Sequence, residues 1–304
     1  MSAGVRLGLA PVNWNNDDVS EWGQTLSYAD LVATAARLGY AGVEDGTGAP
    51  ASAGELGALL ARHALALPGA YRWATLSDPA RVAQEIEAAL GVARRLAAAG
   101  GDVLLVAEHW TAARRAVAGR AADHPDLALE AGAYACLGGA LNELGRRVSA
   151  LGMRLAFHPH VGTPVETPAE LDRLMAATDP ALVGLCLDTG HTAYAGGDAL
   201  GVATRYAARV AYVHAKDVDT EALADARRRN LGLLDGLRRG VFSPAYGTAA
   251  ERSAVDLDRV GAVLRQAGFA GWVIMECDRN PRVGDPAAEA AAARDRLAAA
   301  FGAA

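Results

Sequence analysis

Short apolar segments alternate with longer amphipathic stretches along almost the whole chain. The apolar segments read as near-continuous hydrophobic runs, which is typical of parallel strands buried on both faces. They predict strands over residues 5–10, 41–45, 66–72, 102–107, 153–158, 182–188, 210–214 and 272–276. The amphipathic stretches predict helices over residues 28–38, 52–63, 78–98, 127–150, 167–177, 256–267 and 286–302. Several helical runs end in glycine before the next strand, as in AARLGYAGVED and LRQAGFAGWVIME, because glycine terminates helices well.

Eight strands that alternate with helices predict either a closed (β/α)₈ barrel, the TIM-barrel fold, or an open doubly wound α/β sheet. We favour the barrel because no G-x-G-x-x-G follows the first strand, and because polar residues follow nearly every strand. Barrels gather their functional groups at that C-terminal face of the strands. No Pro-rich or Ser-rich linker divides the chain, so we expect one domain over residues 1–304, with a loop insertion at about 217–254 that contains a short helix.

Composition narrows the function classes. The 304 residues are 52% hydrophobic but only 6% aromatic, which favours many helices packed around a compact sheet. The net charge is −6 and the basic residues are scattered, so nucleic acid is not an expected partner. Neither a membrane-length apolar run nor a signal peptide is evident, and the three cysteines form no CxxC pair, so we expect a cytoplasmic protein without a disulfide framework. The sequence leaves open whether the protein forms a homo-oligomer.

Four strand ends carry side chains that bind metals. His158, Asp188, His214 and Glu276 close four successive predicted strands. In a closed barrel these positions converge, and two imidazoles with two carboxylates suit Mn²⁺, Co²⁺, Fe²⁺ or Zn²⁺. Each residue alone reads more simply as a hydrogen-bonded structural residue. The four together predict one divalent metal site.

Further polar residues lie next to these four. His160 follows His158 by two residues, and His191 follows Asp188 by three; either suits proton transfer at neutral pH, or the orientation of a metal ligand. Lys216 and Asp217 follow His214 directly. A lysine there suits the neutralisation of a developing enolate or the binding of a hydroxyl, and an ion pair at the rim is the alternative.

The remaining candidates suit a ring that bears many hydroxyls. They follow the first, second and fourth strands as well as the fifth and seventh, and the predicted substrate-binding set is Trp14, Asn15, Glu44, Glu108, His160, Lys216 and Asp217. Because consecutive strand residues point to opposite sides, only one of Glu44 and Asp45 is expected to face inward. Trp14, Trp73 and Trp110 suit the apolar face of a sugar-like ring.

The segments FHPH, LDTGH, VHAKD and VIME resemble the xylose-isomerase-like barrel superfamily of sugar isomerases, epimerases and dehydratases. Within it the chain is most similar to the inosose dehydratases, through APVNWNNDD, AGVEDG, FHPHVGTPVET and GWVIMECDRNP. The superfamily pattern favours Glu44 over its neighbour as the residue that faces inward. The chain departs from the pattern at His158, where the superfamily commonly has Glu, and in YGTAAERSAVD, which replaces a shorter acidic segment.

The resemblance implies dehydration of a cyclic ketopolyol such as 2-keto-myo-inositol through an enediolate. It implies Mn²⁺ or Co²⁺ above Fe²⁺, Zn²⁺ or Mg²⁺ on the four ligands, with Glu276 as proton acceptor and His160, His191 or Lys216 as the acid. A metal-dependent isomerase or epimerase is the alternative, and a polyol-binding protein without turnover is a third class. A barrel endonuclease is disfavoured because that activity typically needs a multinuclear site with more His and Glu ligands and a basic groove, and the sequence indicates neither.

Overall fold

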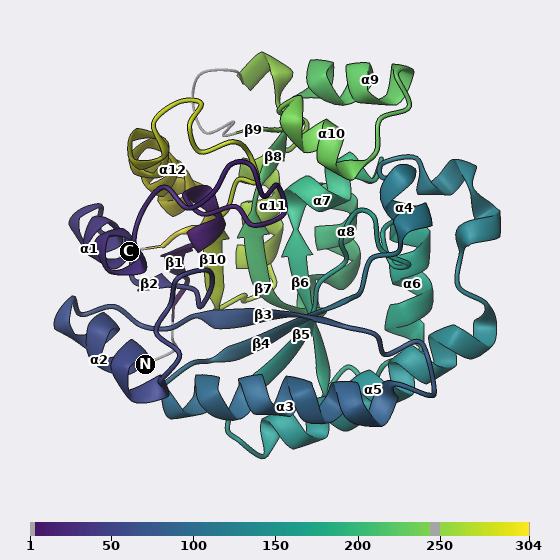
Figure 1. Ribbon diagram of the computed structural model, residues 1–304, viewed down its shortest axis with the longest axis horizontal. Helices are drawn as coiled ribbons and strands as arrows, with labels where there is room; N and C mark the ends of the chain where they lie inside the picture. The colour runs from purple at the N-terminus through teal and green to yellow at the C-terminus, as the bar shows by residue number, and fades with distance from the viewer. Residues whose placement is uncertain (1–3, 244–249, 304) are drawn as a thin grey trace.

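The eight predicted strands form a closed parallel barrel. The computed structural model describes residues 4–243 and 250–303, and Figure 1 shows the strands at its centre. The strands are β1 (Arg6–Leu9), β2 (Gly42–Val43), β3 (Gly69–Ala74), β4 (Val103–Glu108), β5 (Arg154–Phe157), β6 (Val183–Asp188), β7 (Val210–Ala215) and β10 (Trp272–Met275). Their order in the sheet is β2-β1-β10-β7-β6-β5-β4-β3. Parallel bridges from Gly42 to Ala66 and from Asp45 to Ala70 join the two edges and close the barrel.

Helices pack around the outside of this barrel. The seven predicted ones are α1 (Tyr28–Arg37), α2 (Ala53–Arg62), α3 (Val82–Ala98), α5 (Ala131–Ser149), α6 (Pro168–Ala176), α11 (Leu257–Gln266) and α12 (Pro286–Phe301). Several of these helices begin with a side-chain cap: Ser27 and Ser52 accept backbone N–H bonds, and Thr167 with Glu170 forms a capping box. Among the described residues, no helix is long and apolar enough to cross a membrane.

The structure differs from the sequence prediction in several short elements. Three helices were not predicted, namely α4 (Ala112–Ala116), α7 (Thr189–Tyr194) and α8 (Ala199–Tyr206). Each spans only one or two turns, which is too short for a clear hydrophobic period. The third strand begins at Gly69 and not at residue 66, because Pro68 has no N–H to donate to the sheet.

The predicted insertion after the seventh barrel strand contains more structure than one short helix. The two-residue strands β8 (Asp217–Val218) and β9 (Phe242–Ser243) pair antiparallel, and between them lie α9 (Thr220–Arg228) and α10 (Leu233–Arg238). Residues 244–249 of the insertion, with the first part of YGTAAERSAVD, lie outside the described residues.

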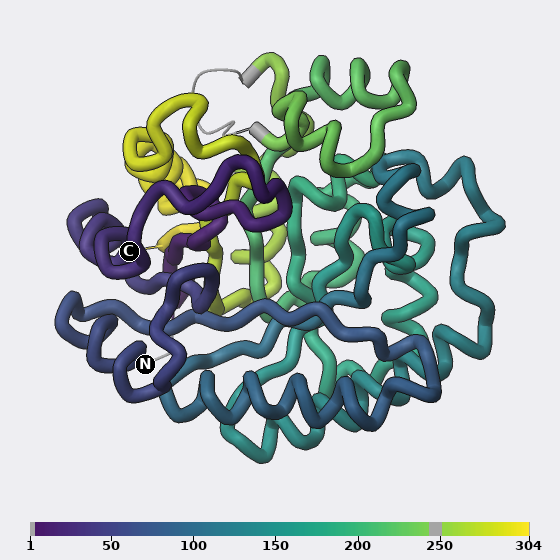
Figure 2. Tube along the Cα trace, in the orientation of Figure 1, coloured from purple at the N-terminus to yellow at the C-terminus, as the bar shows by residue number. Residues whose placement is uncertain are grey.

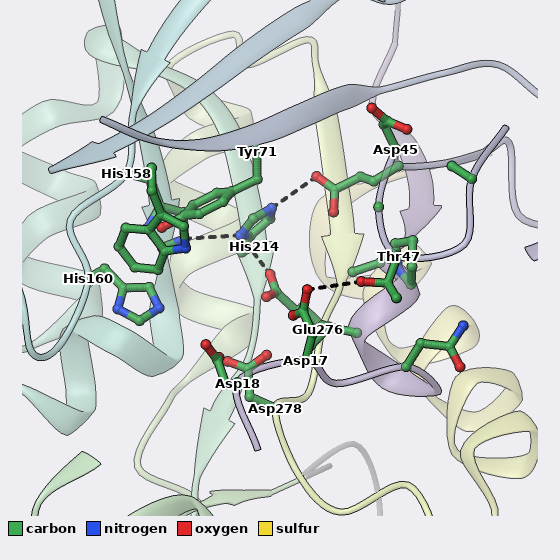
Figure 3. Close-up of a pocket in the computed structure, with 18 of the residues that line it drawn as sticks. Asp17, Asp18, Asp45, Thr47, Tyr71, His158, His160, His214, Glu276 and Asp278 are labelled. Atoms are coloured by element: carbon green, nitrogen blue, oxygen red, sulfur yellow. Dashed lines mark hydrogen bonds and ion pairs between the residues drawn. The ribbon is translucent and has the colours of Figure 1, made fainter. Parts of the chain in front are cut away.

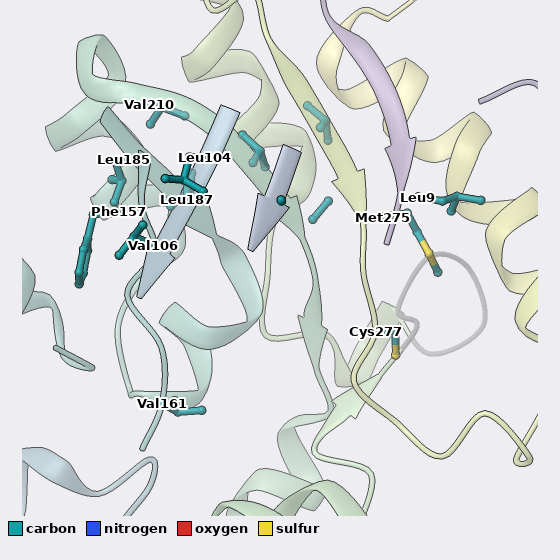
Figure 4. Packing of buried hydrophobic residues seen from close by; sticks show 14 of the residues in the cluster. Leu9, Leu104, Val106, Phe157, Val161, Leu185, Leu187, Val210, Met275 and Cys277 are labelled. Carbon is teal, nitrogen blue, oxygen red and sulfur yellow. The ribbon is translucent and has the colours of Figure 1, made fainter. Parts of the chain in front are cut away.

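Two layers of apolar side chains form the core. The outer layer lies between the strands and the helices, and Figure 4 shows part of it around Leu104, Val106, Phe157, Leu185 and Leu187. The inner layer fills the barrel with residues that include Ala156, Cys186, Tyr212 and Ile274. Because side chains alternate along a strand, the residue two positions after each of these four also points inward. Those residues are His158, Asp188, His214 and Glu276.

The long segment between β1 and α1 lies across the open end of the barrel, beside the insertion and the segment before α12 (Figure 2). Arg282 Nε donates to the backbone oxygen of Trp22 at 3.1 Å, and Arg238 Nε donates to Glu21 Oε1 at 2.6 Å. Residues 11–18 of this segment, together with residues 44–49 after β2, are called the entrance loops below.

Candidate metal centre and cavity

Three of the four predicted ligands, His158, His214 and Glu276, lie close together at the C-terminal mouth of the barrel (Figure 3), and Asp188 lies beside them. His158 Nε2 lies 3.1 Å from His214 Nδ1 and 3.3 Å from Asp188 Oδ2. His214 Nδ1 lies 3.7 Å from Asp188 Oδ2 and 2.6 Å from Glu276 Oε2. His214 Nδ1 therefore lies within 3.7 Å of one atom of each of the other three residues.

This arrangement fits a divalent ion. Two ligand atoms that share one ion at about 2.1 Å lie roughly 3.0–3.4 Å apart, and the separations above lie around that range. Asp188 Oδ2 and Glu276 Oε2 are buried and accept no hydrogen bond. Lys216 Nζ lies within ion-pair distance of the first oxygen, and His214 Nδ1 lies within that distance of the second. Buried carboxylate oxygens without a donor are costly, and a bound cation would satisfy them. The donor set of two nitrogens and two oxygens suits a divalent transition metal.

A buried lysine holds the carboxylates in place. Lys216 is fully buried, and its Nζ lies 3.2 Å from Asp188 Oδ2, 3.1 Å from Glu276 Oε1 and 2.5 Å from Asp278 Oδ2. Burial opposes its charge, but the carboxylates of Asp188, Asp278 and Glu276 raise the pKa of Lys216 well above its usual range. Burial likewise opposes the charge on Glu276, while His214 and Lys216 bring the pKa of this carboxyl below its usual value. The acidic ligand Glu276 is therefore ionised at neutral pH.

Space for the lysine depends on a glycine. A Cβ atom on Gly190 would lie 2.5 Å from Lys216 Cγ, closer than real Cβ contacts allow. This explains the small residue between Asp188 and His191 in LDTGH. Asp188 also caps α7, since its Oδ1 accepts the N–H of His191 at 2.7 Å.

His160 and His191 lie against each other beside the ligands. Their ring centroids are 3.7 Å apart. Burial lowers the pKa of His160 to about 3, and burial with the nearby His160 and Lys216 lowers the pKa of His191 well below its usual range. Both rings are therefore neutral at pH 7. Of the two, His160 lines the cavity described next.

A cavity of about 480 Å³ opens above the four ligands. Its lining includes three of them, His158, His214 and Glu276, together with residues of the entrance loops and of β3. His160, Tyr71 and Trp73 form one wall, where Trp73 packs against His160 with ring centroids 4.8 Å apart. The Tyr71 hydroxyl is buried without a hydrogen-bond partner. The volume suits a ligand the size of a small ring.

The asparagines of the first entrance loop hold the backbone. Asn13 Nδ2 donates to the backbone oxygens of Ala10 and Met275, and its Oδ1 accepts the N–H of Cys277. Asn16 Oδ1 accepts the N–H of Asp18 at 3.0 Å. Asn15 lines the cavity as predicted, but its amide atoms bond the backbone of residues 25 and 26. Trp14 is buried and does not belong to the described lining.

Two other predicted substrate-binding residues are engaged in fixing loops. Glu108 accepts the N–H groups of Leu76 and Ser77 and the Ser77 hydroxyl. Asp217 accepts the N–H groups of Val218 and Ala254 and the Ser253 hydroxyl, which ties the insertion to the barrel. Neither carboxylate belongs to the described lining, nor does the side chain of Lys216 behind Glu276.

Glu44 and Asp45, which follow the end of β2 at Val43, both belong to the described lining, but their side chains bond different partners. Glu44 Oε1 accepts the Tyr212 hydroxyl at 2.7 Å and lies 3.1 Å from His214 Nε2. Asp45 pairs instead with Arg95.

A buried network fixes the loop that carries His160. Glu166 Oε2 accepts the N–H of Gly162 at 2.7 Å, and its Oε1 accepts the N–H of Gly119 at 2.8 Å. Glu170 forms a two-bond pair with the fully buried Arg114. Burial raises the pKa of Glu166 to about 7 although both backbone donors favour its charged form.

Sequence reasoning missed several cavity residues: Asp17, Asp18, Thr47, Tyr71, Arg95 and Asp278. The two neighbouring aspartates in NWNNDD and the aspartate two positions after Glu276 were available signals. Asp278 follows Glu276 by the same two-residue spacing that relates His160 to His158. Arg95, on α3, carried no signal because it reaches the cavity from an outer helix.

The fold is a parallel eight-stranded barrel, and a buried cluster of imidazoles and carboxylates lies at its mouth. Together these features are typical of barrel enzymes with a metal centre. Residues 32–300 match the xylose isomerase-like TIM barrel family, and the chain belongs to that family. It is an enzyme of this superfamily, and the similar curated proteins include inosose dehydratases.

The inosose dehydratase of Geobacillus kaustophilus (strain HTA426) is 32% identical over 297 residues, which cover 96% of this chain and 93% of that protein. The inosose dehydratase of Lacticaseibacillus casei is 31% identical over 283 residues, with coverage of 93% and 92%. Among solved structures, the IOLI protein with a binding zinc atom has a TM-score of 0.67 at 14% identity, with 98% of each chain covered. That likeness shows the shared fold.

Proposed function

We propose that this chain is a metal-dependent hydro-lyase that removes water from a cyclic ketopolyol such as 2-keto-myo-inositol. The observation that carries the proposal is the convergence of His158, Asp188, His214 and Glu276 beneath a cavity of about 480 Å³. Near full-length similarity to inosose dehydratases supports dehydration as the reaction.

His158, Asp188, His214 and Glu276 would hold the ion, and the donor set favours Mn²⁺ or Co²⁺, with Fe²⁺, Zn²⁺ or Mg²⁺ as alternatives. A bound divalent ion supplies a Lewis acid that polarises the substrate carbonyl and acidifies the neighbouring C–H. Lys216 keeps Glu276 oriented by pairing with Oε1, which leaves Oε2 directed toward the other ligands.

The protein's own groups handle the proton and the ring. His160 is neutral and lines the cavity, so it is placed to accept a proton from the substrate carbon next to the carbonyl and to return it to the departing hydroxide, which leaves as water. His191 stacks on His160 and positions it. Trp73 offers an aromatic surface to the ring, and the Tyr71 hydroxyl is free to bind a substrate hydroxyl.

The test is incubation of the metal-loaded protein with 2-keto-myo-inositol, followed by mass spectrometry and ultraviolet absorbance. A product lighter by one water that absorbs in the ultraviolet supports dehydration. A product of unchanged mass overturns it in favour of an isomerase or epimerase. Protein that neither binds Mn²⁺, Co²⁺, Fe²⁺ or Zn²⁺ nor gains thermal stability from these ions overturns the enzymatic proposal altogether.

A variant pair separates the proton-transfer group from the metal centre. His160→Gln should lower turnover by about 100-fold or more while the bound metal stays at the wild-type level, because general base catalysis contributes about that much. His124→Gln, on the outer surface between two 3₁₀ turns, is the matched control and should leave both readouts unchanged. Equal turnover in the two variants would remove His160 from the mechanism.

A further inference from the structure

The cavity is strongly acidic on the side of the entrance loops. Its lining includes six carboxylates, those of Asp17, Asp18, Glu44, Asp45, Glu276 and Asp278, and Asp188 lies directly behind them. Arg95 is the single Lys or Arg side chain that the described lining sets against these six carboxylates, so acidic groups are in surplus. The surplus includes Asp17 and Asp18, which are not metal ligands.

The positive groups near the cavity are already engaged. Within the described lining, Arg95 is the single Lys or Arg side chain. Its guanidinium bonds both oxygens of Asp45 and the backbone oxygens of Pro50 and Ala51. Lys216 lies behind the cavity wall among three carboxylates. Neither cation is available to an anionic group on a ligand.

The helix ends that could receive a phosphate are also occupied. Barrels that bind phosphate commonly use the loops after the seventh and eighth strands and a helix N-terminus there. In this chain Asp219 caps α9 after β7, and Asp285 caps α12 after β10. Asp188 caps α7 after the sixth barrel strand. Carboxylates therefore stand where a phosphate would need N–H donors.

Of the two acidic residues Asp17 and Asp18, Asp18 lies deeper in the cavity. Asn16 accepts its backbone N–H and fixes the turn, so that the Asp18 side chain is directed toward Asp278 and His160 (Figure 3). Asp17 is exposed and bonds the Thr47 hydroxyl at the rim. A charge within the cavity is less screened than one at the rim, so Asp18 has the stronger influence on a bound ligand.

From this arrangement we propose that Asp18 is a specificity-determining residue that restricts the cavity to uncharged polyols and excludes phosphorylated or carboxylated ones. The inference rests on the proposed function and deepens it, because the fold alone leaves the charge of the substrate open. The uncharged hydroxyl of Tyr71 and the ring of Trp73 remain as the groups that a neutral polyol contacts.

The experiment measures binding, so that it stands whether the reaction is dehydration or isomerisation. Calorimetry with the Mn²⁺-loaded protein gives the dissociation constants of myo-inositol and myo-inositol 1-phosphate, and the ratio of the two is the readout. Asp18→Asn should lower the phosphate-to-neutral ratio by about 10-fold, the order expected for removal of one partly screened charge. The contribution of the bound metal to the ratio of dissociation constants cancels between variants, because every variant carries the same ion.

Asp126→Asn is the control for net charge, since this residue is exposed on the 3₁₀ turn Pro125–Leu127 and should change the ratio by less than about twofold. An amino-deoxy-inositol tests the sign: Asp18→Asn should weaken its binding relative to myo-inositol. A phosphate-to-neutral ratio that is unchanged in Asp18→Asn, or an amine that shifts in the same direction as the phosphate, overturns the proposal.

Discussion

The ligand cluster and the entrance loops are built on different principles. The ligands end barrel strands, and each lies two residues beyond an inward-facing core residue, as Asp188 lies beyond Cys186. The entrance loops contain no barrel strand and are fixed by side-chain bonds to the backbone, as in the three bonds of Asn13. The proposed ligands therefore lie at strand ends, whereas the proposed specificity residue Asp18 lies on a loop.

The largest expected effect comes from breaking the cluster. Asp188→Asn keeps the shape of the side chain but removes a negative charge beside Lys216. Loss of an outer partner of a metal ligand already costs about 10–100-fold in metal affinity, so loss of a ligand should cost at least about 100-fold. Metal content after dialysis and turnover should fall together. Full metal occupancy in this variant would show that the ion binds elsewhere.

Breaking the entrance loop should instead affect stability. Asn13→Ala leaves the buried Cys277 N–H without its partner, and it removes one of two donors from the oxygens of Ala10 and Met275, which each keep a backbone N–H. At about 1–3 kcal/mol for the unsatisfied N–H and about 0.5–1.5 kcal/mol for each of the other two bonds, a loss of about 2–6 kcal/mol in the free energy of unfolding is expected. Chemical denaturation measures it. Asn142→Ala is the control, because its one bond, from the Asp179 N–H, is exposed and should cost less than about 1 kcal/mol.

This contrast also explains what the sequence could predict. The barrel and the clustering of the four proposed ligands follow from hydrophobic runs and the two-residue period of strands, and the structure brings His158, Asp188, His214 and Glu276 together. The same period predicts different directions for Glu44 and Asp45, and the two side chains bond different partners, Tyr212 and Arg95. Asn15, Glu108 and Asp217 are residue types that suit the binding of polyols, yet their side chains bond the backbone of loops. Only the folded structure distinguishes substrate binding from the fixing of a loop.

The loop that carries His160 follows a barrel strand and is also fixed by side-chain bonds to its backbone. The dependence of the free energy of unfolding on pH tests this fixation by Glu166. Burial raises the pKa of Glu166 to about 7 from an ordinary 4.5, so the folded chain binds this proton more tightly than the unfolded chain. The associated stability is present below pH 4.5 and is lost as the pH rises to about 7. The loss amounts to up to about 3 kcal/mol.

Glu166→Gln removes that titration, so its unfolding free energy should fall less between pH 4.5 and 8 than that of the wild type. A fixed cost at all pH values is also expected, because one amide oxygen cannot accept from both Gly119 and Gly162. The slope against pH, and not the offset, is therefore the readout. Glu130→Gln, an exposed change of the same kind, should keep the wild-type slope. Parallel curves for Glu166→Gln and wild type would contradict the assignment.

The smallest effect is expected where the two entrance loops touch. The Thr47 hydroxyl donates to Asp17 Oδ2 at 3.0 Å, and this bond is exposed although Thr47 is half-buried. Water replaces such a bond readily, so Thr47→Val should cost less than about 1 kcal/mol of stability and leave the metal content unchanged. Thermal unfolding and metal analysis check both points. A loss as large as that of Asn13→Ala would mean that the loops are held together at the rim, and that the backbone bonds of the asparagines are not what fixes them.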